Sequence, residues 1–192
     1  MTNWILIIVM VLVIIFIVYT FIHMYNRLVS LRNRVENSFA QIDVQLKRRN
    51  DLIPNLVETV KGYTKHEKET FKMVTEARSA TMGAKTVKQA AEAENAMQGA
   101  LGRIFALAEA YPELKANENF QTLQTQLQDT EDKIQAARRF YNAGAKDLNT
   151  RIKTFPVNII NNMVGHFKTR EYFEVNEAEK AKIEKAPDVK FD

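Results

Sequence analysis

A long apolar run near the start of the chain constrains the fold more than any other feature. All sixteen residues from Trp4 to Tyr19 are apolar, and the stretch without a firmly charged side chain extends to Tyr25. A helix rises about 1.5 Å per residue, so roughly 20 apolar residues cross the hydrocarbon core of a bilayer. Trp4 at one end, and Tyr19 and Tyr25 at the other, are aromatic residues of the kind found at membrane interfaces. The run therefore predicts a transmembrane anchor over residues 1–25.

Two other interpretations of this run fit less well. A buried core helix seldom needs to be apolar on every face. A cleaved signal peptide has a basic start and small residues at its cleavage site, whereas Met1, Thr2 and Asn3 are uncharged and the far flank offers no such site. We therefore expect an anchor that is not cleaved.

The charges around the run predict its orientation. No Lys or Arg precedes it, whereas Arg27, Arg32 and Arg34 follow it closely. Basic flanks stay on the cytoplasmic side, so we expect the N-terminus outside and the rest of the chain in the cytoplasm. The absence of cysteine is compatible with a reducing compartment. A net charge of +4 suits contact with anionic membrane lipid better than a nucleic-acid surface, and no nucleic-acid partner is expected.

The rest of the chain predicts an all-α fold, because strand-like alternation is missing and helix breakers are sparse. The first helix is expected to run from Trp4 to about Asn50, with Asp51 capping the next helix and Pro54 in its first turn. The other expected limits are Ser79–Gly83 for the end of the second helix, Thr86 to Ala110 for the third, and Phe120 to Phe155 for the fourth. The predicted architecture is an N-terminal transmembrane helix continuous with an antiparallel up-down four-helix bundle over 26–175.

The fourth helix carries an apolar seam with heptad spacing, which includes Leu127, Ile134 and Tyr141. This seam fits either a self-associating coiled coil or the inside of an intramolecular bundle. The bundle is favoured, because the other three helices need partners for their own apolar faces. The segment Val157–Phe173 is expected to cap the bundle, with a membrane-surface location as the alternative. Residues 176–192 form a charged tail.

Catalytic patterns are missing. The chain has no Cys, and His23, His66 and His166 are scattered without the spacing of a helical zinc site. No glycine-rich phosphate loop is present, and the carboxylates, among them Glu94 and Glu131, are interpreted as solvated helix faces. We therefore expect no enzymatic activity, no cofactor and no metal site.

Three long runs resemble the LemA family, and the resemblance extends from end to end of the chain. They begin with Lys47-Arg48-Arg49-Asn50-Asp51-Leu52-Ile53-Pro54, with Tyr111-Pro112-Glu113-Leu114 and with Ala137-Arg138-Arg139-Phe140-Tyr141. The resemblance implies a bacterial membrane protein with one N-terminal anchor and an antiparallel helical bundle. It implies no reaction, although relatedness to a magnetosome-membrane protein hints at membrane organisation and gene neighbourhood hints at quality control.

Two functions remain open from the sequence. The first is a non-enzymatic scaffold in the bacterial cell membrane, which binds unidentified protein partners and associates with a second copy of itself as a homo-oligomer. The second is a membrane organiser that binds or shapes lipid through Val157–Phe173. An up-down bundle brings the Asp51–Asn55 and Tyr111–Asn117 turns to its cytoplasmic tip. The expected partner surface at this tip comprises Arg48, Arg49, Asp51, Tyr111 and Glu113, unless the tip is only a helix reversal.

Overall fold

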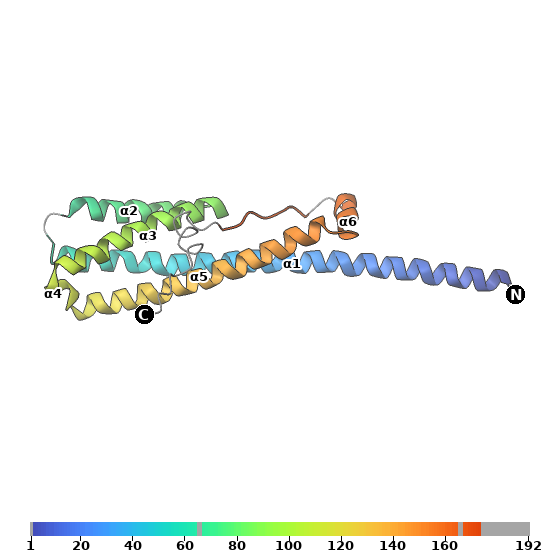
Figure 1. Cartoon of the computed structure of the whole chain (residues 1–192), viewed down its shortest axis with the longest axis horizontal. Helices are drawn as coiled ribbons and strands as arrows, with labels where there is room; N and C mark the ends of the chain where they lie inside the picture. The colour runs from blue at the N-terminus through green and yellow to red at the C-terminus, as the bar shows by residue number, and fades with distance from the viewer. Residues whose placement is uncertain (1, 65–66, 165–166, 174–192) are drawn as a thin grey trace, which may run out of the picture. The chain divides into compact units, whose positions relative to one another are not determined.

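A computed structural model describes residues 2–64, 67–164 and 167–173. Within these ranges the chain forms six helices and no strand (Figure 1). The helices are α1 (Thr2–Lys61), α2 (Lys68–Gly83), α3 (Val87–Ala110), α4 (Pro112–Lys115), α5 (Glu118–Lys153) and α6 (Val157–Val164). The all-α prediction is confirmed, and the third and fourth predicted helices match α3 and α5 to within about two residues.

The chain divides into two compact units, and α1 and α5 contribute residues to both. Unit 1 comprises Met1–Ala40 and Arg139–Arg170, and unit 2 comprises Gln41–Arg138 and Glu171–Asp192. Residues 176–192, predicted as a charged tail, lie outside the described residues.

The N-terminal part of α1 has the length and composition of a membrane span. Its most apolar 18-residue window has a mean hydropathy of 3.4, and none of that window is buried against the protein. Within the part of the chain that the structure describes, α1 is the one helix with this property. Side chains exposed on every face suit a hydrocarbon solvent, because such a helix has no other partner for its apolar surface.

The predicted end of the first helix at Asn50 is wrong, because α1 continues through Asp51 and Pro54 to Lys61. A proline inside a helix removes one hydrogen bond and leaves the carbonyl four residues earlier without its donor. Here that carbonyl belongs to Asn50, and Nε of Arg78 on α2 donates to it at 3.0 Å. A tertiary hydrogen bond thus replaces the one that Pro54 cannot make. Asp51 is accordingly a mid-helix residue and not an N-cap.

Unit 2 holds a core to which α1, α2, α3, α4 and α5 all contribute. Its buried members include Leu56, Val74, Ile104, Leu114 and Phe120. The loop after α1 and the turn before α5 meet at one end, where the Asn117 side-chain amide donates to the Tyr63 hydroxyl at 2.9 Å. The predicted Asp51–Asn55 turn is therefore wrong, because these residues are helical and the loop that meets the Tyr111–Asn117 turn follows Lys61.

Local signals explain the limits of α3. Thr86 has extended backbone angles and its hydroxyl accepts a hydrogen bond from the backbone N–H of Gln89 at 3.2 Å, which caps the N-terminus. Tyr111 ends the helix, because the residue before Pro112 avoids the helical region.

Unit 1 packs the part of α1 that follows the apolar run against the last part of α5. Gly144 allows the closest approach, since a side chain there would lie 3.4 Å from the Val35 Cγ2. Next to this crossing, the rings of Phe39 and Tyr141 have centroids 5.9 Å apart. The seam of α5 is therefore internal in this unit, as the intramolecular interpretation expects.

The short helix α6 has two different faces. Val157 and Ile160 are buried, whereas Ile159 and Met163 are exposed. The inward face agrees with the capping interpretation of the Val157–Phe173 segment. The outward face leaves the membrane-surface interpretation open.

Candidate interaction site

A buried ionic network joins three helices of unit 2. Arg49 on α1 has no exposed surface, and its Nη1 donates to Glu94 on α3 at 2.8 Å and to Glu131 on α5 at 2.9 Å. The Nη2 of Arg49 donates to the other carboxylate oxygen of Glu94. The planar guanidinium suits this task, because its fixed fork of donors engages one carboxylate with two hydrogen bonds.

Glutamine side chains extend the network toward the surface. The Nε2 of Gln98 on α3 donates to Glu131 at 2.9 Å and to Glu94 at 3.3 Å, and the Nε2 of Gln135 donates to Glu131 at 3.2 Å. The Glu94 side chain is fully buried, whereas that of Glu131 is 24% exposed. Glu131 is therefore the point at which the buried network reaches solvent.

A groove of about 440 Å³ lies between α3 and α5 at this point. Its apolar lining includes Leu101, Phe105 and Leu127, and its polar lining includes glutamines and the carboxylates of Glu131 and Asp132. The complete lining is Gln98, Leu101, Gly102, Phe105, Gln124, Leu127, Gln128, Glu131, Asp132 and Gln135. We call this feature the α3–α5 groove.

The lining of the α3–α5 groove offers apolar side chains, amides and carboxylates. It contains no Ser, Cys, His or Lys to act as nucleophile or to pair with a base. Across the described ranges, no group of three His, Asp or Glu side chains is placed to hold a metal ion. Glutamine amides both donate and accept hydrogen bonds, which matches the peptide groups of a polypeptide.

Two carboxyl groups near the network have shifted pKa values. A hydrogen bond from Lys133, at 2.7 Å, holds the pKa of Asp129 below its ordinary value, and the positive charge of Arg48 adds to this effect. Partial burial raises the pKa of Asp43.

The structure separates the predicted partner-surface residues. Arg48 is exposed on α1, near enough to Asp129 to affect its pKa. Arg49 is fully buried in the network, so its placement on a partner surface is wrong. Asp51 is exposed but lies ten residues before the end of α1, about 15 Å along the helix, and so it is not in the predicted turn.

The other two predicted residues do lie at a turn. Tyr111 is half-buried and ends α3, and Glu113 is exposed in α4. The structure therefore does not bring the five residues together as one tip. Partner binding by the exposed ones, Arg48, Asp51 and Glu113, stays a prediction.

Sequence reasoning missed Glu94 and Glu131, which were interpreted as solvated carboxylates. For Glu94 that interpretation is wrong, because its side chain is fully buried. A signal was available: Ala90, Glu94, Met97 and Leu101 follow the spacing of four, three and four that defines the apolar face of α3. A carboxylate in such a position needs a buried cation.

The fold and the groove define a class: a helical protein that has, among its described residues, one helix long and apolar enough to span a membrane, and a bundle built around a buried ionic network. The chain belongs to the LemA family, whose pattern matches residues 38–191.

Two relatives illustrate the similarity. Protein LemA of Metamycoplasma hominis is 29% identical over 136 residues, which cover 70% of this chain and 62% of that protein. This chain thus spans less than two thirds of that relative's length. The magnetosome protein MamQ 2 of Paramagnetospirillum magneticum is 25% identical over 195 residues, which cover 88% of this chain and 71% of the relative.

Proposed function

We propose that this protein is a non-enzymatic scaffold, anchored in the bacterial cell membrane by α1, that presents unit 2 to protein partners in the cytoplasm. The observation that carries this proposal is the α3–α5 groove, in which the buried Arg49 donates a hydrogen bond to the lining residue Glu131. The cytoplasmic location follows from Arg27, Arg32 and Arg34, which come directly after the apolar run.

The buried network supports a binding role better than a stabilising one. Burying an ion pair costs so much desolvation that apolar residues of the same volume are often as stable or more stable. Arg49 instead holds the Glu131 carboxylate in one position at the edge of the groove. A binding group that is held in place before the partner arrives loses less entropy when the complex forms.

The proposed partner is a polypeptide segment that lies in the α3–α5 groove. The half-buried Phe105 offers apolar contact above the buried Leu101 and Leu127, and the glutamine amides offer hydrogen bonds to a peptide backbone. A second copy of the chain is one such partner, which would make the protein a homo-oligomer.

Two glycines of α3 provide a matched test. A Cβ atom added at Gly99 or Gly102 would meet no atom within 4 Å, but only Gly102 lines the groove. Gly102→Phe should therefore fill the groove without disturbing the fold, and Gly99→Phe should leave the groove open. A photo-crosslinking amino acid at Gln128, used in intact cells and followed by mass spectrometry, reports on the occupant of the groove.

The proposal expects a defined cross-linked protein that is lost with Gly102→Phe and kept with Gly99→Phe, while both variants melt like the parent. Cross-linked dimers of the chain would identify the partner as a second copy. Equal cross-linking in the two variants would show that the groove does not bind the partner.

A further inference from the structure

The net positive charge of this protein is concentrated in the unit that carries the apolar span. Unit 1 contains nine Lys or Arg residues against two acidic residues, Glu36 and Asp147, which gives a formal charge of +7. The whole chain has a net charge of only +4. A strongly basic unit that continues an apolar span suits an anionic membrane surface.

A chain of contacts holds α6 beside the end of the span. The ring of Tyr25, at the end of the uncharged stretch of α1, packs against Phe167 with centroids 5.7 Å apart. The side chain of Asn161 on α6 exchanges two hydrogen bonds with the Phe167 backbone, at 3.1 and 3.2 Å.

Near this place, three apolar side chains point outward. Phe155, Ile159 and Met163 recur every fourth residue, and they are 74%, 49% and 74% exposed. The opposite face of α6 packs against the protein, because its residues Val157 and Ile160 are buried. The exposed face is therefore a fixed apolar surface beside a membrane span.

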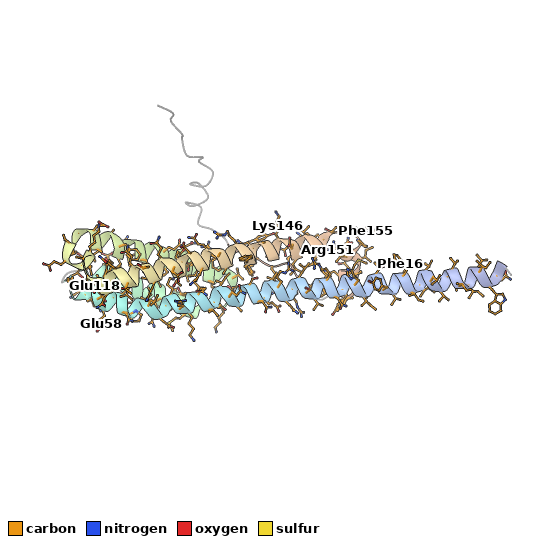
Figure 2. All side chains as sticks on the ribbon, turned by 90° about the horizontal axis from the view of Figure 1, so that it is seen from below. Phe16, Glu58, Glu118, Lys146, Arg151 and Phe155 are labelled. Atoms are coloured by element: carbon orange, nitrogen blue, oxygen red, sulfur yellow. The ribbon has the colours of Figure 1, made fainter. Side chains whose placement is uncertain are left out.

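Exposed basic residues flank the apolar side chains. Arg151 and Lys153 lie in the last turn of α5, directly before Phe155, and Lys168 follows Phe167. Figure 2 shows Arg151 next to Phe155 at this end of α5. An apolar face with basic neighbours is the arrangement by which an interfacial helix binds anionic lipid.

We propose that Phe155 and α6 form a lipid-binding site that inserts Phe155, Ile159 and Met163 into the membrane interface, while Arg151, Lys153 and Lys168 bind anionic phospholipid headgroups. Interfacial helices bury their apolar face about 5–10 Å into the boundary between headgroups and acyl chains. The site uses none of the residues of the α3–α5 groove, so it stands independently of the scaffold role.

The absence of native cysteine permits a direct test with the full-length protein. Single-cysteine variants Phe155→Cys, Ile159→Cys and Met163→Cys carry an environment-sensitive fluorophore in vesicles of phosphatidylcholine with phosphatidylglycerol. Doxyl groups on the lipid acyl chains then quench fluorophores that enter the bilayer. Phe140→Cys is the matched control, because Phe140 is a similarly exposed phenylalanine of α5 in unit 1, at 69%.

The proposal expects blue-shifted emission and strong quenching at 155, 159 and 163, with neither at 140. Substituting Arg151, Lys153 and Lys168 together by Gln should remove most of the quenching at 163. Emission and quenching at positions 155, 159 and 163 that equal those at 140 would overturn the proposal. The proposal would also be overturned by a blue shift that increases with the protein-to-lipid ratio and is not accompanied by quenching from the lipid. Such a result would mean that a second copy of the chain covers this face. Unchanged quenching in the Gln variant would overturn the assignment of the three cations.

Discussion

The Arg49 guanidinium donates to both carboxylate oxygens of Glu94, although the two residues are 45 positions apart in the chain. Neither side chain has any exposed surface. Each residue therefore depends on the other to be buried at all, because an unpaired charge in a protein interior is very costly.

Arg49→Met should destabilise unit 2 by about 3–5 kcal/mol, because it leaves the buried Glu94 carboxylate without its cation. Urea unfolding of the detergent-solubilised chain measures this loss. The exposed neighbour provides the control, since Arg48→Met should change stability by less than about 0.5 kcal/mol. Replacing Arg49, Glu94 and Glu131 together by apolar residues should restore most of the stability. An Arg49→Met protein as stable as the parent would mean that the network contributes nothing to the fold.

Two substitutions at Gly144 should have opposite effects. An alanine Cβ there lies 3.4 Å from the Val35 Cγ2, an ordinary contact, and alanine gains up to about 1 kcal/mol of helix propensity over glycine. Gly144→Leu should instead force α1 and α5 apart and cost about 1–3 kcal/mol. Thermal unfolding followed by circular dichroism distinguishes the two. A well-tolerated leucine would show that the crossing at Val35 is looser than the structure shows.

Leu127→Ala should cost about 2–5 kcal/mol, because Leu127 is only 3% exposed within the unit 2 core. Val44→Ala is the comparison, since Val44 is 62% exposed and its truncation should lie within about 0.5 kcal/mol of the parent. Denaturant midpoints of the two variants test this difference. Equal midpoints would place Leu127 on the surface.

Asp129 should stabilise the fold only while it is ionised. The hydrogen bond from Lys133 lowers its pKa in the folded state, so this contribution is complete above the unfolded-state pKa of about 3.9. The contribution is lost as the pH falls through the lower folded-state pKa. An NMR titration of the Asp129 carboxyl measures the shift, and Lys133→Met should raise the pKa toward its ordinary value. An unchanged pKa in that variant would assign the shift to another group.

A single cysteine at Met82, which is 66% exposed near the end of α2, tests the orientation. Because basic residues follow the span, the cysteine should resist a membrane-impermeant maleimide in intact cells and react after lysis. A cysteine at Asn3, before the span, should show the opposite pattern. Labelling of Met82→Cys in intact cells would place unit 2 outside the cytoplasm.

The sequence alone determined the features that depend on neighbouring residues. The apolar run from Trp4 to Tyr19, continued without a firmly charged side chain to Tyr25, defines a helix of spanning length, because a bilayer core has a fixed thickness. Thr86 and Pro112 set the limits of α3 through capping and a steric clash, both of which act within a few residues.

Only the tertiary structure decided what depends on distant residues. Helix α1 continues past Pro54 because Arg78, from another helix, donates to the Asn50 carbonyl that the proline leaves free. Glu94 is buried because Arg49 reaches it from α1, and the same side chain positions Glu131 at the α3–α5 groove. Local sequence gives the preference of each segment, but long-range interactions can reverse it. A hydrogen bond from a charged group contributes about 1.5–3 kcal/mol, which is comparable to the cost of about 3 kcal/mol for a proline inside a helix.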